Sequence, residues 1–200
     1  MSFDAAHGLS ALLEPDHPRK VDTADWARAT FADDDIVGRD LECTFSETGW
    51  KLCAEHGILG LRVPEAYGGQ DLDLISTLLT LEGLGLGCPD NGLTFALASQ
   101  VWAIQGALVR FGSDEQRQRW LPPMVAGDAL GAFAISEPET GSDSFALGAT
   151  ARRDHDGSYV LNGTKAHITM GPRCDVMLVF ASTRPEAGRW GLSAFLVPMD

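Results

Sequence analysis

The chain has 200 residues, of which 44% are hydrophobic and 22% charged, so its composition is that of a folded protein and not of a disordered one. Its 15 basic and 28 acidic residues give a net charge of −13, which argues against nucleic acid and anionic membranes as partners. Four cysteines show neither zinc-site nor disulfide-scaffold spacing. Since Met1–Asp4 opens no secretory signal, we expect a cytoplasmic location.

Residues 1–127 are predicted to form an α-helical domain. Apolar residues share one face of a helix over residues 40–56, recur in residues 74–86, and return at steps of three and four in residues 93–111. Residues 91–109 carry no charge, but their amide and hydroxyl side chains make them too polar for a bilayer. With Trp102 on the opposite side, this stretch is predicted to be a core helix buried nearly all round.

A short helix is predicted to start at Ser113, because Ser113 and Gln116 have the spacing of a capping box. The acidic run 33–35 lacks further ligands at metal-binding spacing. It is interpreted as a solvated turn, and no metal site is predicted.

Residues 128–200 are predicted to form a β domain, because the period of the pattern changes and Asp-Gly and Asn-Gly turn signals interrupt it. The predicted strands are 130–136, 146–153, 158–161, 176–183 and 192–198. A helical domain followed by an antiparallel sheet gives an α+β fold.

One segment, residues 133–143, has features of a ligand-binding loop. Its strand ends near Ser136, Pro138 prevents further pairing, and Gly141 frees the backbone so that successive N–H groups could converge on an anion. Two interpretations remain open from these residues: an ordinary Gly-Ser-Asp turn, which spacing alone favours, or a phosphate-binding loop.

The sequence of this segment, Phe-Ala-Ile-Ser-Glu-Pro-Glu-Thr-Gly-Ser-Asp, resembles the signature of the acyl-CoA dehydrogenase family, with Ser136 in place of the usual threonine. Further stretches match the family in order and spacing over most of residues 40–200: 64–69, 110–116, and 161–165 leading to 168–169. The resemblance implies a helical domain and a β domain, a C-terminal four-helix domain absent from these residues, and FAD as cofactor.

The resemblance also implies the residues of a flavin site. Phe133, Ile135 and Ser136 would contact the isoalloxazine together with Ala134 between them, and Gly141 and Ser142 would meet the pyrophosphate. Ser142 would also contact the thioester substrate. On a second segment, Thr169 would lie near flavin N5, flanked by Ile168 and by His167, which replaces the family's tryptophan. We expect His167 to stack and not to titrate in catalysis.

The family's reaction is α,β-dehydrogenation of an acyl thioester, with FAD accepting hydride and a glutamate of the C-terminal domain acting as base. No catalytic residue is therefore assigned within residues 1–200, and Glu137 and Glu139 are not candidates. A homo-oligomer or a complementary C-terminal chain would complete the protein. Electron-transfer flavoprotein or oxygen would accept the electrons.

The substrate would be an acyl-CoA or a thioester on an acyl or peptidyl carrier protein. Residues 92–97, 171–176 and 191–196 look like those of members that act on carrier-bound substrates, including prolyl ones. Two alternatives stay open: a flavin-dependent monooxygenase of the same superfamily, and a non-catalytic binding subunit that pairs with a separate C-terminal half.

Overall fold

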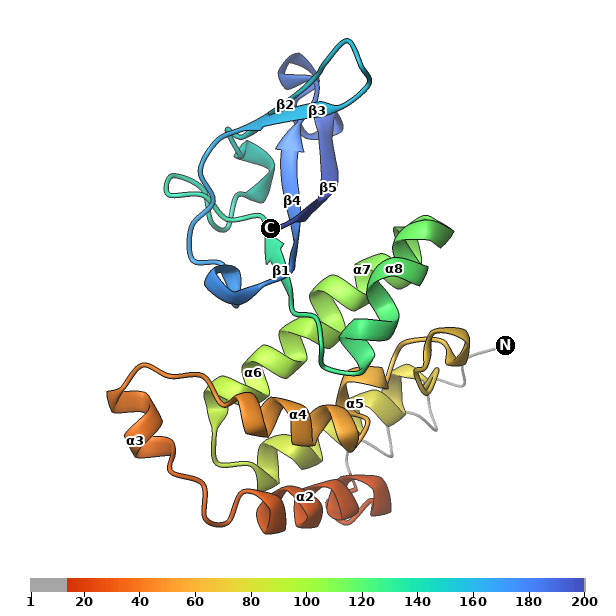
Figure 1. Cartoon of the computed structure of the whole chain (residues 1–200), viewed down its shortest axis with the longest axis vertical. Helices are drawn as coiled ribbons and strands as arrows, with labels where there is room; N and C mark the ends of the chain where they lie inside the picture. The colour runs from red at the N-terminus through yellow and green to blue at the C-terminus, as the bar shows by residue number, and fades with distance from the viewer. Residues whose placement is uncertain (1–13, 200) are drawn as a thin grey trace. The chain divides into compact units, whose positions relative to one another are not determined.

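The computed structural model describes residues 14–199, so the amino-terminal segment considered above for a secretory signal lies outside the described residues. The chain falls into two compact units, one ending at Asp128 and the other beginning at Ala129. Helices make up the first unit and a sheet organises the second (Figure 1). The predicted order, helices before strands, is confirmed.

The first unit packs its helices around a core that includes Trp50, Ile58, Leu84, Leu97 and Leu121, each at most 2% exposed. Its α-helices are α2 (Pro18–Thr30), α3 (Ile36–Leu41), α4 (Glu47–Glu55), α5 (Leu74–Gly87), α6 (Asn91–Ser99), α7 (Gly106–Phe111) and α8 (Asp114–Val125). The predicted capping box is confirmed at the start of α8, where the Ser113 and Gln116 side chains each accept the other residue's backbone N–H.

The single helix predicted over residues 40–56 is wrong. The chain forms α3 and α4 instead, and Cys43 between them adopts a left-handed conformation with φ 53°. The Ser46 hydroxyl then accepts the backbone N–H of Gly49 at 3.2 Å, which starts α4 anew. Leu41, expected on the buried face, is 80% exposed. The apolar spacing runs across this break without interruption. The pattern therefore gave no sign that Ser46 starts a second helix.

The helix predicted over residues 93–111 forms as α6, the π-helical segment η3 (Gln100–Gln105) and α7 in succession. Its row of Leu93, Leu97, Val101, Ile104 and Leu108 is buried. The expectation of burial on nearly every side is wrong, because Phe95, Trp102 and Phe111 are 63%, 36% and 78% exposed. In length and composition Asn91–Phe111 also resembles a membrane span, but core helices of soluble proteins share these properties.

The second unit contains all five predicted strands: β1 (Gly131–Ala134), β2 (Thr150–Arg153), β3 (Tyr159–Asn162), β4 (Val176–Ser182) and β5 (Leu192–Pro198). The sheet is mixed, and the prediction of a wholly antiparallel sheet is corrected. β2–β3 and β4–β5 pair antiparallel, whereas β4 pairs parallel with β1 and, at one position, with β2. Turn signals identify only strands that follow one another, and long connections between the others permit parallel pairing.

One core cluster of the sheet unit consists of three alanines and a leucine. Leu147, Ala149, Ala151 and Ala181 are buried together, and Ile135 from the end of β1 packs on them. The connection that leaves β1 is therefore anchored on the core where the predicted signature begins.

Candidate functional site

The chain makes a tight turn just after β1, in the middle of the signature. The N–H of Glu137 donates to the carbonyl of Thr140 at 2.9 Å, and the N–H of Thr140 donates back at 3.2 Å. Pro138 lies at the exposed tip, where its missing N–H costs nothing. The chain therefore reverses direction between residues 137 and 140, directly before residues 141–143.

The Glu137 carboxylate holds the inside of this turn. One oxygen accepts the backbone N–H of Gly148 at 2.6 Å, and the other accepts the N–H of Ala149 at 2.9 Å and the Lys165 ammonium at 2.8 Å. Burial alone would raise the pKa of Glu137, but these hydrogen bonds outweigh it and hold the pKa below its ordinary value. With both oxygens engaged, Glu137 is a structural carboxylate, as the resemblance implied, and is not available as a base.

Lys165 connects the turn to the second predicted segment. Its Nζ also donates to the carbonyl of Ile135 at 3.0 Å, and the adjacent Ala166 N–H donates to the carbonyl of Ser136 at 3.0 Å. Residues 135–137 and 165–166 are thus joined by side-chain and backbone hydrogen bonds. The structure brings together the two signature segments that the sequence placed about 30 residues apart.

The flavin-contacting residues predicted on β1 and just after it differ in their solvent exposure. Phe133 is partly buried against Phe180, with ring centroids 4.9 Å apart. Ala134 is buried, at 0% exposure. Ile135 is also partly buried, and Ser136 stands at the point where the strand reaches the surface.

His167, Ile168 and Thr169 lie on the second segment. His167 is exposed and adopts a left-handed backbone with φ 56°, which histidine tolerates better than most residues. Ile168 and Thr169 are partly buried and lead into a turn closed by the N–H of Gly171 on the carbonyl of Ile168 at 3.0 Å. His167 and Thr169 thus belong to a short loop that follows Ala166, the residue bonded to the signature at Ser136.

Two features of the loops fit an anionic ligand with hydrogen-bonding edges. Gly141 is exposed, and a Cβ built on it would meet nothing within 4 Å, so the chain's own packing does not require glycine there. Within residues 14–199 the hydroxyls of Ser136, Ser142 and Thr169 make no hydrogen bond. Open backbone at a glycine and uncommitted hydroxyls are what a phosphate-bearing cofactor needs.

Sequence reasoning missed the role of Lys165. The residue belonged to a recognised motif, but only the structure shows its ammonium between a carbonyl and a carboxylate. The sequence did contain a signal: one motif beside the predicted site carries the acidic Glu137, and the other carries the basic Lys165. Asp143, the last residue of the signature, accepts the Ala146 N–H with its backbone carbonyl at 3.0 Å, and its side chain does not cap the short helix η4 (Ser144–Ala146) that follows.

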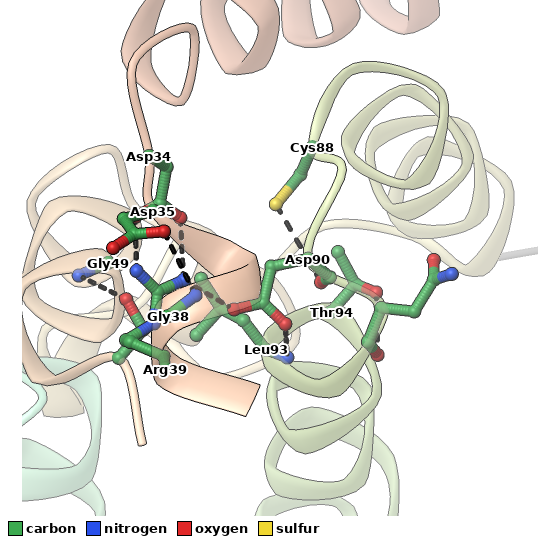
Figure 2. A network of polar contacts seen from close by, with 11 residues as sticks. Asp34, Asp35, Gly38, Arg39, Gly49, Cys88, Asp90, Leu93 and Thr94 are labelled. Atoms are coloured by element: carbon green, nitrogen blue, oxygen red, sulfur yellow. Dashed lines mark hydrogen bonds and ion pairs between the residues drawn. The ribbon is translucent and has the colours of Figure 1, made fainter. Parts of the chain in front are cut away.

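A second polar cluster lies in the helical unit (Figure 2). Arg39 forms ion pairs with Asp34 and with Asp90, the latter at 2.8 Å, and Asp90 also caps α6 by accepting the N–H of Leu93 at 2.9 Å. The two carboxylates, each with its hydrogen bond to the guanidinium, raise the pKa of Arg39. The nearby Asp35 caps α3, so two members of the predicted acidic turn have structural partners.

Hollows of about 460 and 500 Å³ border this cluster, and Arg39 lines both. None of the residues predicted to form the site is among those that line them. Because two aspartates pair with Arg39, its positive charge is not available to a ligand, and we interpret the cluster as a structural link between α3 and the start of α6.

Comparison with known proteins agrees with the two-unit architecture. Residues 23–128 match the acyl-CoA dehydrogenase N-terminal domain, and residues 132–200 match the acyl-CoA dehydrogenase middle domain. The chain belongs to the acyl-CoA dehydrogenase family. Its signature and second motif therefore lie in the family's middle domain, and the helices before them form the N-terminal domain.

Family members of known activity show similarity over large parts of the chain. The L-prolyl-[peptidyl-carrier protein] dehydrogenase of Pseudomonas fluorescens is 41% identical over 153 residues, which are 76% of this chain and 40% of that protein. The mitochondrial short-chain specific acyl-CoA dehydrogenase of Sus scrofa is 41% identical over 160 residues, 80% of this chain and 38% of that protein. The chain thus spans less than half the length of these relatives.

Solved structures give the same picture. The prolyl acyl carrier protein oxidase AnaB superposes with a TM-score of 0.86 at 34% identity, over 100% of this chain and 50% of that one. The FAD complex of PigA superposes with a TM-score of 0.83 at 33% identity, with the same coverage.

Proposed function

We propose that this chain supplies the flavin-binding wall of an FAD-dependent dehydrogenase that oxidises the α,β carbon–carbon bond of an acyl thioester. The observation that carries the proposal is that Lys165 and Ala166 join two signature segments, and that the hydroxyls of Ser136, Ser142 and Thr169 make no hydrogen bond within residues 14–199. Family membership and similarity to the FAD complex of PigA support FAD as the cofactor.

In this proposal each loop has a defined task. The backbone at Gly141 and the Ser142 hydroxyl hold the pyrophosphate and approach the thioester arm, since glycine leaves the N–H groups accessible. Ser136 and Thr169 offer hydroxyls to the edge of the isoalloxazine, and Phe133 and Ile135 give the wall its apolar backing. When bound, FAD would supply hydride acceptance, which no amino-acid side chain can provide.

The proton from the α carbon requires a base, and no described carboxylate is proposed for it. Glu137 is engaged by Lys165 and two backbone N–H groups, and its lowered pKa suits a permanent charge more than proton exchange. We propose that the base and part of the cofactor's enclosure come from outside residues 1–200, from a continuing or complementary C-terminal segment. An oligomer is part of the same proposal.

The proposed substrate is a thioester on a phosphopantetheine arm, carried by CoA or by a carrier protein. The relatives support both forms, because one group is named for short-chain acyl-CoA and another for prolyl carrier protein. The electron acceptor would be an electron-transfer flavoprotein or oxygen.

The test begins with FAD titration, followed by anaerobic addition of butyryl-CoA or of a prolyl thioester on a peptidyl carrier protein. We expect the visible flavin absorbance to fade without oxygen in protein that includes a C-terminal segment. The 200-residue chain alone is expected to bind FAD weakly and to oxidise neither thioester. Oxygen consumption with a hydroxylated product would instead identify a monooxygenase, and a folded protein with no flavin signal would identify a binding subunit.

A further inference from the structure

The contact between Glu137 and Lys165 is unusually complete for an ion pair near a surface. The side chains are 9% and 11% exposed, and the ammonium divides its donors between the carboxylate and the Ile135 carbonyl. The carboxylate in turn receives three donors, two of them backbone N–H groups at residues 148 and 149. The pair therefore joins three segments: the end of β1, the linker before β2, and the loop after β3.

The position of the pair relates it to the proposed site. Glu137 directly follows Ser136, and Lys165 precedes Thr169 by four residues, so each charged residue lies on a segment that also carries an uncommitted hydroxyl. The Ala166 N–H that meets the Ser136 carbonyl completes the link at 3.0 Å. A shift of either charged side chain would change the spacing between the two hydroxyls.

We propose that Glu137 and Lys165 are positioning residues that hold the Ser136 and Thr169 segments at the spacing a bound flavin requires. This inference rests on the proposed function, because it assigns the pair a part in cofactor binding. Neither residue touches the cofactor in this account, and their effect passes through the backbone of residues 135–136 and 165–166.

The chemistry of the pair makes it directional. Glu137 only accepts hydrogen bonds, which matches its three donors, and Lys165 only donates, which matches its carbonyl and carboxylate acceptors. Exchanging the two residues would set a donor against the N–H groups of Gly148 and Ala149. The exchange preserves the net charge but cannot restore the hydrogen bonds.

The experiment compares Glu137→Gln, Lys165→Met, their double variant, and the exchange of Glu137→Lys with Lys165→Glu. It uses the form of the protein that retains FAD, and it measures FAD affinity, visible circular dichroism of the bound flavin, and melting of the apoprotein. Lys165→Arg, which keeps the charge, serves as a second variant if Lys165→Met does not fold. Arg152→Met is the matched control, because Arg152 pairs with Asp154 in the same unit at 3.5 Å and its side chain is 67% exposed.

We expect each single variant to weaken FAD binding at least about five-fold and to alter the flavin dichroism. The double variant should be little worse than the singles, since they remove one shared interaction. The exchange should not restore binding, and Arg152→Met should behave like the parent.

Variants that melt at lower temperature yet bind FAD with the parent's affinity and dichroism would overturn the inference, because the pair would then only stabilise the fold. Recovery by the exchanged pair would also overturn it. A parent protein that binds no FAD in any form would instead show that the proposed function itself is wrong, and would remove the basis of this inference.

Discussion

Each of the two units contains a cationic side chain that binds acceptors far from it in the sequence. The two clusters differ in the elements that they connect. Arg39 joins α3 to Asp90, the residue that starts α6, and its side chain is 21% exposed. Lys165 joins two loops through a carboxylate and a carbonyl, and its side chain is 11% exposed. The first cluster secures secondary structure, whereas the second sets the spacing of loops that we propose bind a cofactor.

This difference shows why similar ion pairs call for different measurements. Loss of a helix cap and its ion pair should appear in the free energy of unfolding. Displacement of a loop should appear mainly in ligand binding and less in stability, because a surface loop contributes few buried apolar contacts to global stability. The following changes test that division, from the largest expected effect to the smallest.

Asp90→Ala should have the largest effect, a loss of about 2–4 kcal/mol in the free energy of unfolding. The substitution removes the cap of α6 and leaves Arg39 with only Asp34 as a carboxylate partner. Denaturant titration followed by far-ultraviolet circular dichroism would measure it. Arg28→Met is the control, since Arg28 and Asp25 are 56% and 67% exposed and their pair should contribute less than about 1 kcal/mol. A similar loss in both variants would contradict the assignment of the cluster.

In the assembled form of the protein that retains FAD, Gly141→Val should abolish FAD retention, a loss of at least about ten-fold in affinity, with little change in stability. A Cβ added at this position would meet no atom of the chain within 4 Å, so we expect the effect to arise from the ligand's approach. Gly163→Val provides the contrast, because Gly163 has φ 149° and its Cβ would lie 2.7 Å from that of Ala149. We expect that variant to lower the melting temperature even without FAD. Equal flavin content in Gly141→Val and the parent would refute the proposed phosphate loop.

Glu137→Gln should reveal the charge of Glu137 through the pH dependence of stability. Because hydrogen bonds hold the folded-state pKa of Glu137 below its ordinary value of 4.5, the carboxylate stabilises the fold above that pH. We expect the parent to exceed the variant by about 1–2 kcal/mol near neutral pH. The difference should shrink as the pH falls below 4.5 and through the folded-state pKa. Calorimetric melts across this range would measure it, and a difference independent of pH would show that charge is not involved.

His167→Trp should have the smallest effect, less than about 0.5 kcal/mol or roughly two-fold in FAD affinity. The side chain is exposed on the loop, and we expect it only to stack against the flavin. The rate of an active holoenzyme should keep the same pH profile in this variant. An inflection in that profile that is present in the parent and missing in the variant would assign His167 a proton or charge role.

The sequence was sufficient for features that depend on neighbouring residues. Five strands and the capping box at Ser113 follow from local pattern, and all are present. The break at Cys43 escaped prediction because a periodic apolar pattern carries no information about where Ser46 restarts a helix. The placement of flavin contacts at residues 133–136 and 167–169 stays a prediction.

The sequence by itself determined the order of the two units, the family, and the segments in which a site should lie, because strand and helix periods and contiguous motifs are written in neighbouring residues. Only the tertiary structure decided that β1 and β2 pair parallel with β4, and that Lys165 meets Glu137 and Arg39 meets Asp90. Glu137 and Lys165 are 28 positions apart, and Arg39 and Asp90 are 51 apart. Whether such residues meet depends on how the connections between them fold. Charge and periodicity show that a residue needs a partner, but chain folding determines which partner it finds.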